Sequence, residues 1–241
     1  IVDKRVGEES RRYKMWFEGR SGVGGLVSTI MFGSSADGTS WPAFVPCTGL
    51  NPSFGQVRVA DPSVLFDGVK YRMWFEAIAT TTGGKDGAAV IGYAESNDGI
   101  AWVIKDAAGN TGAGAGAVFL PAGGSGFDGY SVGSPSVVMD LSDTAAPWKM
   151  WYEAGNESQD VQNTIGYATS QDGLTWSRAT KPVFRPSSDA RIPLPFDSGD
   201  LEHPCALIDF SVPANLDGHF LLWYTGDAEG SATPNRIGFA R

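Results

Sequence analysis

The sequence predicts an all-β protein built from one repeated sheet-forming unit, and three observations lead to this prediction. An apolar-aromatic strand occurs four times, at residues 14–18, 72–76, 149–153 and 221–225. A strand that alternates small and large residues follows each copy, as expected for a period of two. No segment carries the helical apolar period, so recurrence of one unit dominates the sequence. The four copies share a central tryptophan: Trp16, Trp74, Trp151 and Trp223.

Each repeat is expected to hold four strands. The first begins at a proline in three repeats, Pro62, Pro135 and Pro204, because proline is tolerated at the first residue of a strand. The tryptophan strand is second, and the alternating strand at 29–33, 90–94, 164–168 or 236–240 is third. A turn of the form Ser-x-Asp-Gly-x-x-Trp follows at 35–41, 96–102 and 170–176. Its glycine accepts positive φ and its aspartate bonds the local backbone, so the chain reverses into a fourth strand.

Four-stranded antiparallel units repeated in this way are typical of β-propeller blades. We therefore predict a single propeller domain over residues 1–241, with repeats at about 1–53, 54–126, 127–195 and 196–241. The chain ends inside the fourth copy, before its last strand. An incomplete larger propeller of the five-bladed type is the preferred prediction, and a free-standing ring of four blades is the alternative.

Composition excludes several classes of partner and site. A formal charge of −9, a pI near 4.7 and no run of basic residues argue against nucleic acid or an anionic membrane. No apolar stretch approaches the roughly 20 residues of a membrane span. The chain starts at Ile1 with no leader, so its compartment stays open, with a secreted or periplasmic location favoured. Cys47 and Cys205 are too few for a disulfide framework, and only two histidines, His203 and His219, occur, which points to carboxylate chemistry.

The candidate site lies where the innermost strands begin, because in a propeller these strands start beside the central channel. Counting twelve residues back from Met73 reaches Asp61, and the same count from Met15 reaches Asp3, where Lys4 replaces the proline. Crowded carboxylates should raise the pKa of one of them. A protonated and an ionised carboxyl together are what glycoside hydrolysis requires. The residues at these strand starts are Asp3, Asp61, Ser134, Glu202 and His203.

On these motifs the chain resembles the arabinanase/levansucrase/invertase superfamily of five-bladed propeller glycosidases. The resemblance rests on Asp61-Pro62, on the Glu-x-Pro sequence at Glu202, on the Met-Trp-aromatic strands and on the Asp-Gly turns. It implies that Glu202 is the acid and Asp3 the base or nucleophile, with Ser134 where the superfamily has an Asp on the third blade. If the chain instead begins at the second blade, Asp61 takes the place of that third-blade Asp, the acid's position falls at Gly133 or Ser134, and the base lies outside the chain.

Asp128, Asp197 and Asp200 precede inner strands and are considered as substitutes for the missing Asp. Further contacts with a sugar are expected from His203, Ser134, Asp200 and the stacking candidate Tyr130.

The function expected first is hydrolysis of a glycosidic bond, with a carbohydrate as ligand and no cofactor required. Acidic inner-strand residues would suit a structural calcium ion in the channel. Ser134 and Lys4 favour the alternative of a non-catalytic carbohydrate-binding or scaffold propeller. A glycoside phosphorylase is the further alternative, although no cluster of arginine and histidine supplies a phosphate site. The oligomeric state is left open.

Overall fold

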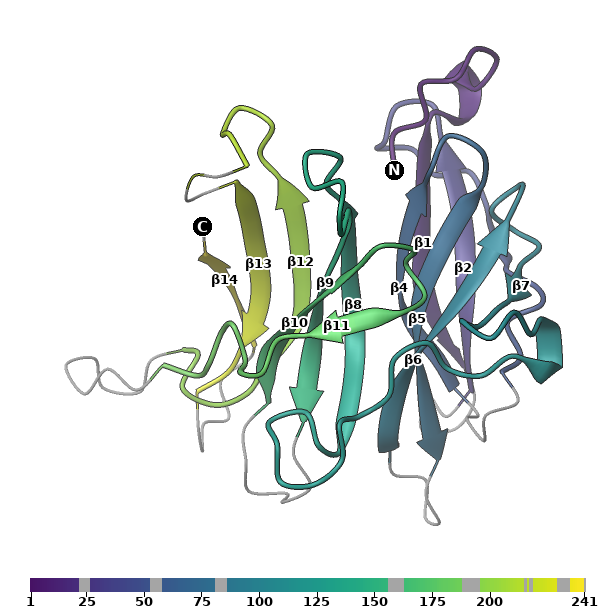
Figure 1. Cartoon of the computed structure of the whole chain (residues 1–241). Coiled ribbons are helices and arrows are strands. Elements are labelled where there is room, and N and C mark those ends of the chain that lie inside the picture. The colour runs from purple at the N-terminus through teal and green to yellow at the C-terminus, as the bar shows by residue number, and fades with distance from the viewer. Residues whose placement is uncertain are drawn as a thin grey trace. The chain divides into compact units, whose positions relative to one another are not determined.

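The computed structural model describes residues 1–21, 27–52, 58–80, 86–155, 163–187, 196–214, 216, 219–228 and 235–240. These residues form antiparallel sheets, with two single-turn 3-10 helices, η1 (Glu9–Arg11) and η3 (Gly112–Gly114) (Figure 1). No helix among them is long and apolar enough to cross a membrane. The chain divides into two compact units, Ile1–Gly87 with Ile91–Val118, and Ala88–Val90 with Phe119–Arg241.

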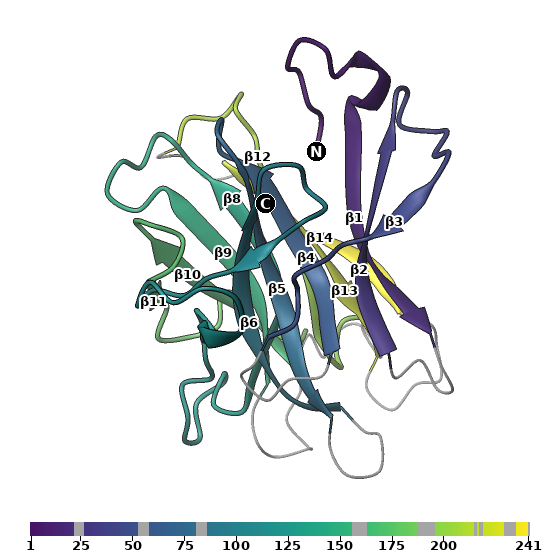
Figure 2. The same ribbon diagram turned by 90° about the vertical axis from the view of Figure 1, so that its right-hand side faces the viewer.

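The first unit contains the sheets of the first two repeats. One sheet has the order β1-β2-β3, from β1 (Tyr13–Ser21), β2 (Val27–Ser35) and β3 (Phe44–Pro46). The other has the order β4-β5-β6-β7, from β4 (Arg58–Phe66), β5 (Tyr71–Thr80), β6 (Asp86–Ser96) and β7 (Val103–Ile104). Figure 2 shows the three strands of the smaller sheet side by side. The two sheets are joined where β4 packs against β1 and β2.

The second unit repeats this plan. Its four-stranded sheet has the order β8-β9-β10-β11, from β8 (Ser131–Met139), β9 (Trp148–Gly155), β10 (Thr164–Ser170) and β11 (Trp176–Arg178). Its three-stranded sheet has the order β12-β13-β14, from β12 (Leu201–Ile208), β13 (Phe220–Gly226) and β14 (Arg236–Ala240). Here β12 packs against β8 and β9. The predicted all-β class is confirmed, and the predicted four-stranded antiparallel sheet is found in the second and third repeats, whereas closure and blade number stay predictions.

The register expected for the first repeat is wrong. No strand runs through Asp3, and only one bridge, Val2 to Tyr13, precedes β1. In the second repeat Phe66 pairs with Tyr71, so Val2 corresponds to Phe66 and Asp3 to the residue that follows it, Asp67. The count of twelve residues failed because the connection from Val2 to Tyr13 is long enough to contain η1, whereas that from Phe66 to Tyr71 is a short turn.

Glycine on the third strand lets an aromatic ring lie flat across the sheet. A β-carbon at Gly166 would overlap the ring of Tyr152, and one at Gly238 would overlap the ring of Tyr224. Both rings are at most 5% exposed and both glycines pair directly with them. The small residues of the alternating pattern are therefore dictated by the rings of the neighbouring strand.

The Ser-x-Asp-Gly-x-x-Trp turn is built as expected. In the third repeat, Ser170 Oγ donates to Asp172 Oδ1 at 3.0 Å and accepts the N–H of Gly173 at 2.8 Å. Asp172 Oδ1 accepts the N–H groups of Leu174 and Thr175. The same bonds recur in the turns that start at Ser35 and Ser96. The turn aspartates are structural.

Substituting Gly166→Ala should destabilise the second unit by about 2 kcal/mol, because overpacking a buried site costs about 1–3 kcal/mol. Gly114→Ala is the matched control, since its β-carbon meets no atom within 4 Å. Equilibrium urea unfolding of both variants measures the difference. Equal midpoints for the two variants would contradict this account of the third strand.

Candidate functional site

The three inner strands β4, β8 and β12 carry a β-bulge at the same place. In β4 the pairing jumps from Ala60 with Glu76 to Ser63 with Trp74, so two residues lie opposite one. The jumps in β8 and β12 fall between Gly133 and Ser136 and between Glu202 and Cys205. Bulges redirect side chains and are frequent beside active sites. The residues that they insert are Asp61-Pro62, Ser134-Pro135 and His203-Pro204.

The residue before each of these prolines has a left-handed backbone. The φ angles are 43° at Asp61, 43° at Ser134 and 48° at His203, and no other non-glycine residue in the described ranges has positive φ. This conformation costs about 1–2 kcal/mol for an L-residue. Such strain concentrates at functional sites, where surrounding structure enforces it. Three repeats therefore keep the same strained position. The prediction that each inner strand begins at its proline is wrong, because β4, β8 and β12 begin earlier, at Arg58, Ser131 and Leu201.

In the first unit Asp61 is half-buried and lies near the start of β4, directly after Ala60, which pairs with Glu76 on β5. Asp3 does not join it, because Asp3 corresponds to Asp67, beyond the other end of β4. Asp3 instead binds Arg5 Nη2 at 2.6 Å and Lys14 Nζ at 3.1 Å, and it accepts the Tyr71 hydroxyl at 3.1 Å. The Arg5 guanidinium holds the pKa of Asp3 far below its usual range.

In the second unit the bulge of β8 is tied to a carboxylate. Ser134 is 5% exposed, and its Oγ donates to Glu153 Oε2 at 3.2 Å. The amide Nδ2 of Asn163 donates to Glu153 Oε1 at 3.0 Å. The backbone N–H of Asn163 donates to Asp200 Oδ1 at 2.6 Å, and its carbonyl accepts the N–H of Leu201 at 3.1 Å. Asn163, which no sequence pattern indicated, thus connects Glu153 to the start of β12.

Glu202 occupies a position at which the repeat is altered. It pairs with Thr225 across β12 and β13, whereas Ala60 pairs with Glu76 and Gly133 with Glu153. In the second and third repeats the glutamate of this cross-strand pair is on the second strand, whereas in the fourth repeat it is Glu202, on the inner strand. The Glu202 side chain is 29% exposed, and its Oε2 lies 3.8 Å from Nδ1 of His203, which is 52% exposed. This end of the unit is thus accessible to a ligand.

Asp200 directly precedes β12 and is held by hydrogen bonds to Asn163 and Asp227. Its N–H donates to Asp227 Oδ1 at 2.6 Å, and the Asp227 carbonyl accepts the N–H of Gly199 at 2.9 Å. Tyr130, 42% exposed, donates its N–H to the carbonyl of Gly155 at the end of β9. Both predicted ligand-binding residues therefore lie at strand ends of the second unit.

Asp128 and Asp197 are hydrogen-bonded to side chains of the core. Asp128 Oδ2 accepts the Tyr152 hydroxyl at 2.9 Å and Arg178 Nη1 at 2.7 Å. Asp197 Oδ2 accepts the Tyr224 hydroxyl at 2.9 Å. Burial, followed by the adjacent carboxylate, raises the pKa of each tyrosine. The second repeat has Phe75, without a hydroxyl, and Gly at the matching sequence position 55, outside the described residues.

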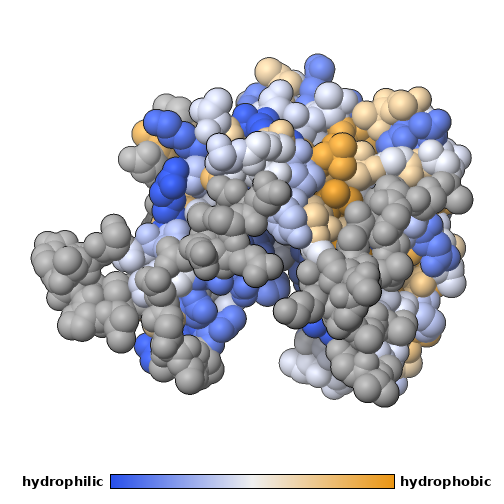
Figure 3. All heavy atoms as spheres, turned by 90° about the horizontal axis from the view of Figure 1, so that it is seen from below, coloured by the Kyte–Doolittle hydropathy of each residue, from blue (hydrophilic) through white to orange (hydrophobic). Residues whose placement is uncertain are grey.

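Figure 3 views the molecule from below. Much of the described surface seen there is hydrophilic, and hydrophobic residues form smaller groups.

Within the described residues no group of three or more His, Cys, Asp or Glu side chains is arranged to hold a metal ion. The calcium suggestion has no supporting cluster in that part of the chain.

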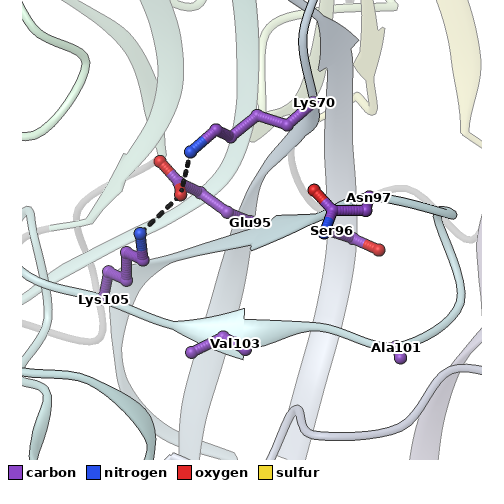
Figure 4. A pocket seen from close by; sticks show the side chains of 7 residues that line it. All are labelled: Lys70, Glu95, Ser96, Asn97, Ala101, Val103 and Lys105. Carbon is purple, nitrogen blue, oxygen red and sulfur yellow. Dashed lines mark hydrogen bonds and ion pairs between the residues drawn. The ribbon is translucent and has the colours of Figure 1, made fainter.

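The first unit contains a pocket, which lies at the opposite end of its four-stranded sheet from Asp61. The pocket measures about 250 Å³ and is lined by Lys70, Glu95, Ser96, Asn97, Ala101, Val103 and Lys105 (Figure 4). Glu95 accepts Lys105 Nζ at 2.6 Å, Lys70 Nζ at 2.8 Å and the Tyr93 hydroxyl at 3.0 Å. The two lysines share the one carboxylate of Glu95, so these side chains form a structural ion-pair network.

No family model matches the chain. An uncharacterized protein of Mycobacterium tuberculosis, found in two strains, is 31% identical over 170 residues, which is 70% of this chain. The match covers 46% of that protein, so the chain spans about half the length of the curated relatives it matches.

Solved structures share the fold. An N-acetylgalactosamine deacetylase from F. plautii, in complex with blood group B trisaccharide, has a TM-score of 0.59 at 16% identity, covering 94% of this chain and 67% of that one. A β-1,2-mannobiose phosphorylase from Listeria innocua, in complex with β-1,2-mannobiose, has a TM-score of 0.58 at 16% identity, covering 88% and 49%. A family 117 glycoside hydrolase from Zobellia galactanivorans has a TM-score of 0.56 at 14% identity, covering 78% and 52%.

The strain at Asp61 can be measured by comparing two truncations. Asp61→Gly and Asp61→Ala both remove the carboxylate, but only glycine adopts φ of 43° without steric conflict. We expect the glycine variant to be more stable than the alanine variant by about 1 kcal/mol. Urea unfolding measures the difference. A more stable alanine variant would show that no backbone strain is held at this position.

The ion-pair network predicts a pH dependence. Burial raises the pKa of Glu95, but hydrogen bonds from Lys105, Lys70 and Tyr93 lower it more, from 4.5 to about 2. Because the folded pKa is depressed, the contribution is complete above pH 4.5 and is lost as the pH falls towards 2. Glu95→Gln should therefore destabilise the protein by about 2 kcal/mol at pH 7. Unfolding of both proteins from pH 7 to 2.5 should show that gap closing, and a constant gap would contradict the assignment.

Proposed function

We propose that the chain is part of a β-propeller glycoside hydrolase in which Glu202 is the general acid and Asp61 the base or nucleophile. One observation carries the proposal: three repeats keep the same strained bulge, and it bears Asp61 in one repeat and His203, directly after Glu202, in another. In a β-propeller the inner strands of all blades begin beside one channel. The likeness to glycan-active proteins supports a carbohydrate ligand.

The roles are those that glycoside hydrolysis requires of two carboxyl groups. As the general acid, Glu202 donates its proton to the glycosidic oxygen as the bond to the anomeric carbon breaks. As the nucleophile or base, Asp61 either attacks that carbon or removes a proton from the water that attacks it. His203 is half exposed, with its Nδ1 3.8 Å from Glu202 Oε2, and in this proposal it binds a sugar hydroxyl. Tyr130 offers an exposed ring for stacking.

Ser134 supports a second candidate function. It lies at the bulge of the third repeat, where its buried hydroxyl donates to Glu153 and supplies no charge of its own. A propeller with this substitution could bind a glycan at the same bulges without cleaving it. A phosphorylase differs from both by its need for inorganic phosphate as the attacking group.

The deciding experiment compares the wild type with Glu202→Gln on a panel of aryl α-L-arabinofuranosides, β-xylosides, β-fructosides and mannosides. We expect a loss of about 100-fold to 10,000-fold in kcat for the variant, because a general acid contributes that much. Glu9→Gln, an exposed glutamate on η1, is the matched control and should keep full activity. Parallel reactions with and without phosphate identify a phosphorylase. Inactive wild type that is still retained on a glycan array would leave the binding function and exclude hydrolysis by this chain.

A further inference from the structure

The pocket of the first unit is lined by more positive than negative charge. Lys70 and Lys105 both donate to the same carboxylate oxygen of Glu95, Oε2, at 2.8 and 2.6 Å (Figure 4). Burial raises the pKa of Glu95, but hydrogen bonds from the two lysines and from Tyr93 lower it more, to about 2, so the carboxylate is ionised at neutral pH. Two ammonium groups thus face one carboxylate, which leaves one positive charge in excess.

The neighbouring charges do not remove this excess. Arg72 donates from Nε to Asp67 Oδ2 at 2.6 Å, so these two side chains neutralise each other. Asp98 belongs to the Asp-Gly turn beside the pocket, and its Oδ1 accepts the N–H groups of Ile100 and Ala101. Asp98 lies outside the lining of the pocket. The excess charge is therefore carried by the lysines at the pocket itself.

Both ammonium groups keep N–H donors that Glu95 does not use. An ammonium group has three donors. Within the described part of the chain, Lys70 and Lys105 each make one side-chain hydrogen bond, the one to Glu95. Their side chains are 30% and 34% exposed, so a ligand from solution can reach the remaining donors. Asn97 is exposed and also lines the pocket, where its side-chain amide adds two N–H donors.

Glu95 is held at its other oxygen, which fixes the lysines before a ligand binds. Its Oε1 accepts the hydroxyl of Tyr93 at 3.0 Å, and that hydroxyl accepts Arg72 Nη1 at 2.8 Å. Tyr93 is fully buried, and the Glu95 side chain is only 13% exposed. Binding groups that are fixed in advance lose less conformational entropy when a ligand arrives.

The charged residues of this pocket depart from the repeat. The tryptophan strands and the Asp-Gly turns align the first three repeats residue by residue. The positions of Lys70, Glu95 and Lys105 are occupied by Arg12, Ser34 and Val45 in the first repeat and by Pro147, Thr169 and Ala179 in the third. The fold of the repeat therefore does not require these charges, and a local site added to the common framework explains them.

The size of the pocket limits the ligand. Its volume of about 250 Å³ is below the range of about 300–1,000 Å³ that is typical of sites for drug-sized molecules. Ala101 and Val103, both exposed, form the apolar part of the wall. One compact group, such as an inorganic oxyanion or a single sugar unit, suits this volume better than an extended chain.

We propose that this pocket binds a compact oxyanion, that is a carboxylate, phosphate or sulfate group, between Lys70 and Lys105. Hydrogen bonds from an ammonium group to such oxygens are about twice as strong as those between neutral groups. The anion is either free in solution or part of an acidic sugar. The acidic-sugar source rests on the proposed function, whereas the anion site itself does not.

Isothermal titration calorimetry of the full chain tests the proposal with sodium phosphate, sodium sulfate, glucuronate, glucose 6-sulfate and neutral glucose. Low ionic strength is used because salt screens exposed charges. The net charge of −9 disfavours binding of anions elsewhere on the chain. We expect one anion per chain, and glucose at least tenfold weaker. Tighter binding of an acidic sugar than of both inorganic anions identifies the sugar as the source, and the reverse order identifies a free oxyanion.

Lysine variants locate the binding. Lys70→Gln and Lys105→Gln should each weaken anion binding at least tenfold, because each removes a charged donor. Lys105→Arg keeps the positive charge and should retain binding. Lys181→Gln, at an exposed lysine of the second unit, is the matched control and should bind like wild type. Circular dichroism verifies that every variant is folded.

Glu95→Gln separates the effect of charge from that of stability. The glutamine carbonyl still accepts a lysine N–H, but the pocket then has two positive charges in excess. This variant should bind the anion several-fold more tightly than wild type, although we expect it to be less stable.

Four results would each overturn the proposal: a wild type that binds no anion, Lys70→Gln and Lys105→Gln variants that bind as tightly as wild type, glucose that binds as tightly as the anions, or a Glu95→Gln variant that binds more weakly. Calorimetry measures binding and not hydrolysis. A chain that binds anions but cleaves no glycoside would therefore reject the proposed function alone.

Discussion

Every sheet of this chain has two apolar faces, and each face can be buried only against another sheet. This constraint explains the repeated tryptophan, which reaches across to the next sheet, as Trp16 does to Tyr71 and Trp151 to Phe220. It also explains the glycines of the third strand, because a face-on ring such as Tyr152 leaves no room for a β-carbon at Gly166.

The inner strands show how function is placed on this framework. Packing alone would favour a regular strand, yet β4, β8 and β12 each insert a residue with positive φ before a proline. The framework tolerates the strain because the one neighbouring strand, β5, β9 or β13, keeps the ladder in register before and after the bulge. Since the bulge residue is free of the regular ladder, it changes between repeats, from Asp61 to Ser134 to His203, while the core stays the same.

Several carboxylates of the chain stabilise the sheets through short hydrogen bonds and ion pairs. Asp3, Glu95 and Asp128 are each held by cations or hydroxyls at short distances, so their carboxylates are committed to structure. The turn aspartates are committed to backbone N–H groups. Glu202 differs because it departs from the repeat and is partly exposed beside an exposed histidine. This contrast, rather than the presence of a carboxylate, selects it as the candidate acid.

The sequence by itself determined the all-β class, the second and third strands of every repeat and the Asp-Gly turns, because these depend on local periodicity and turn chemistry. The prolines were expected at the first residues of the inner strands, but the structure places them inside these strands, in the bulges. Only the tertiary structure decided that Asp3 corresponds to Asp67, because the long first hairpin changes the residue count without changing the register. Only the tertiary structure showed the left-handed backbone at Asp61, the link through Asn163 and the tyrosine partners of Asp128 and Asp197. Each of these depends on contacts between residues far apart in the chain, on which local sequence patterns carry no information.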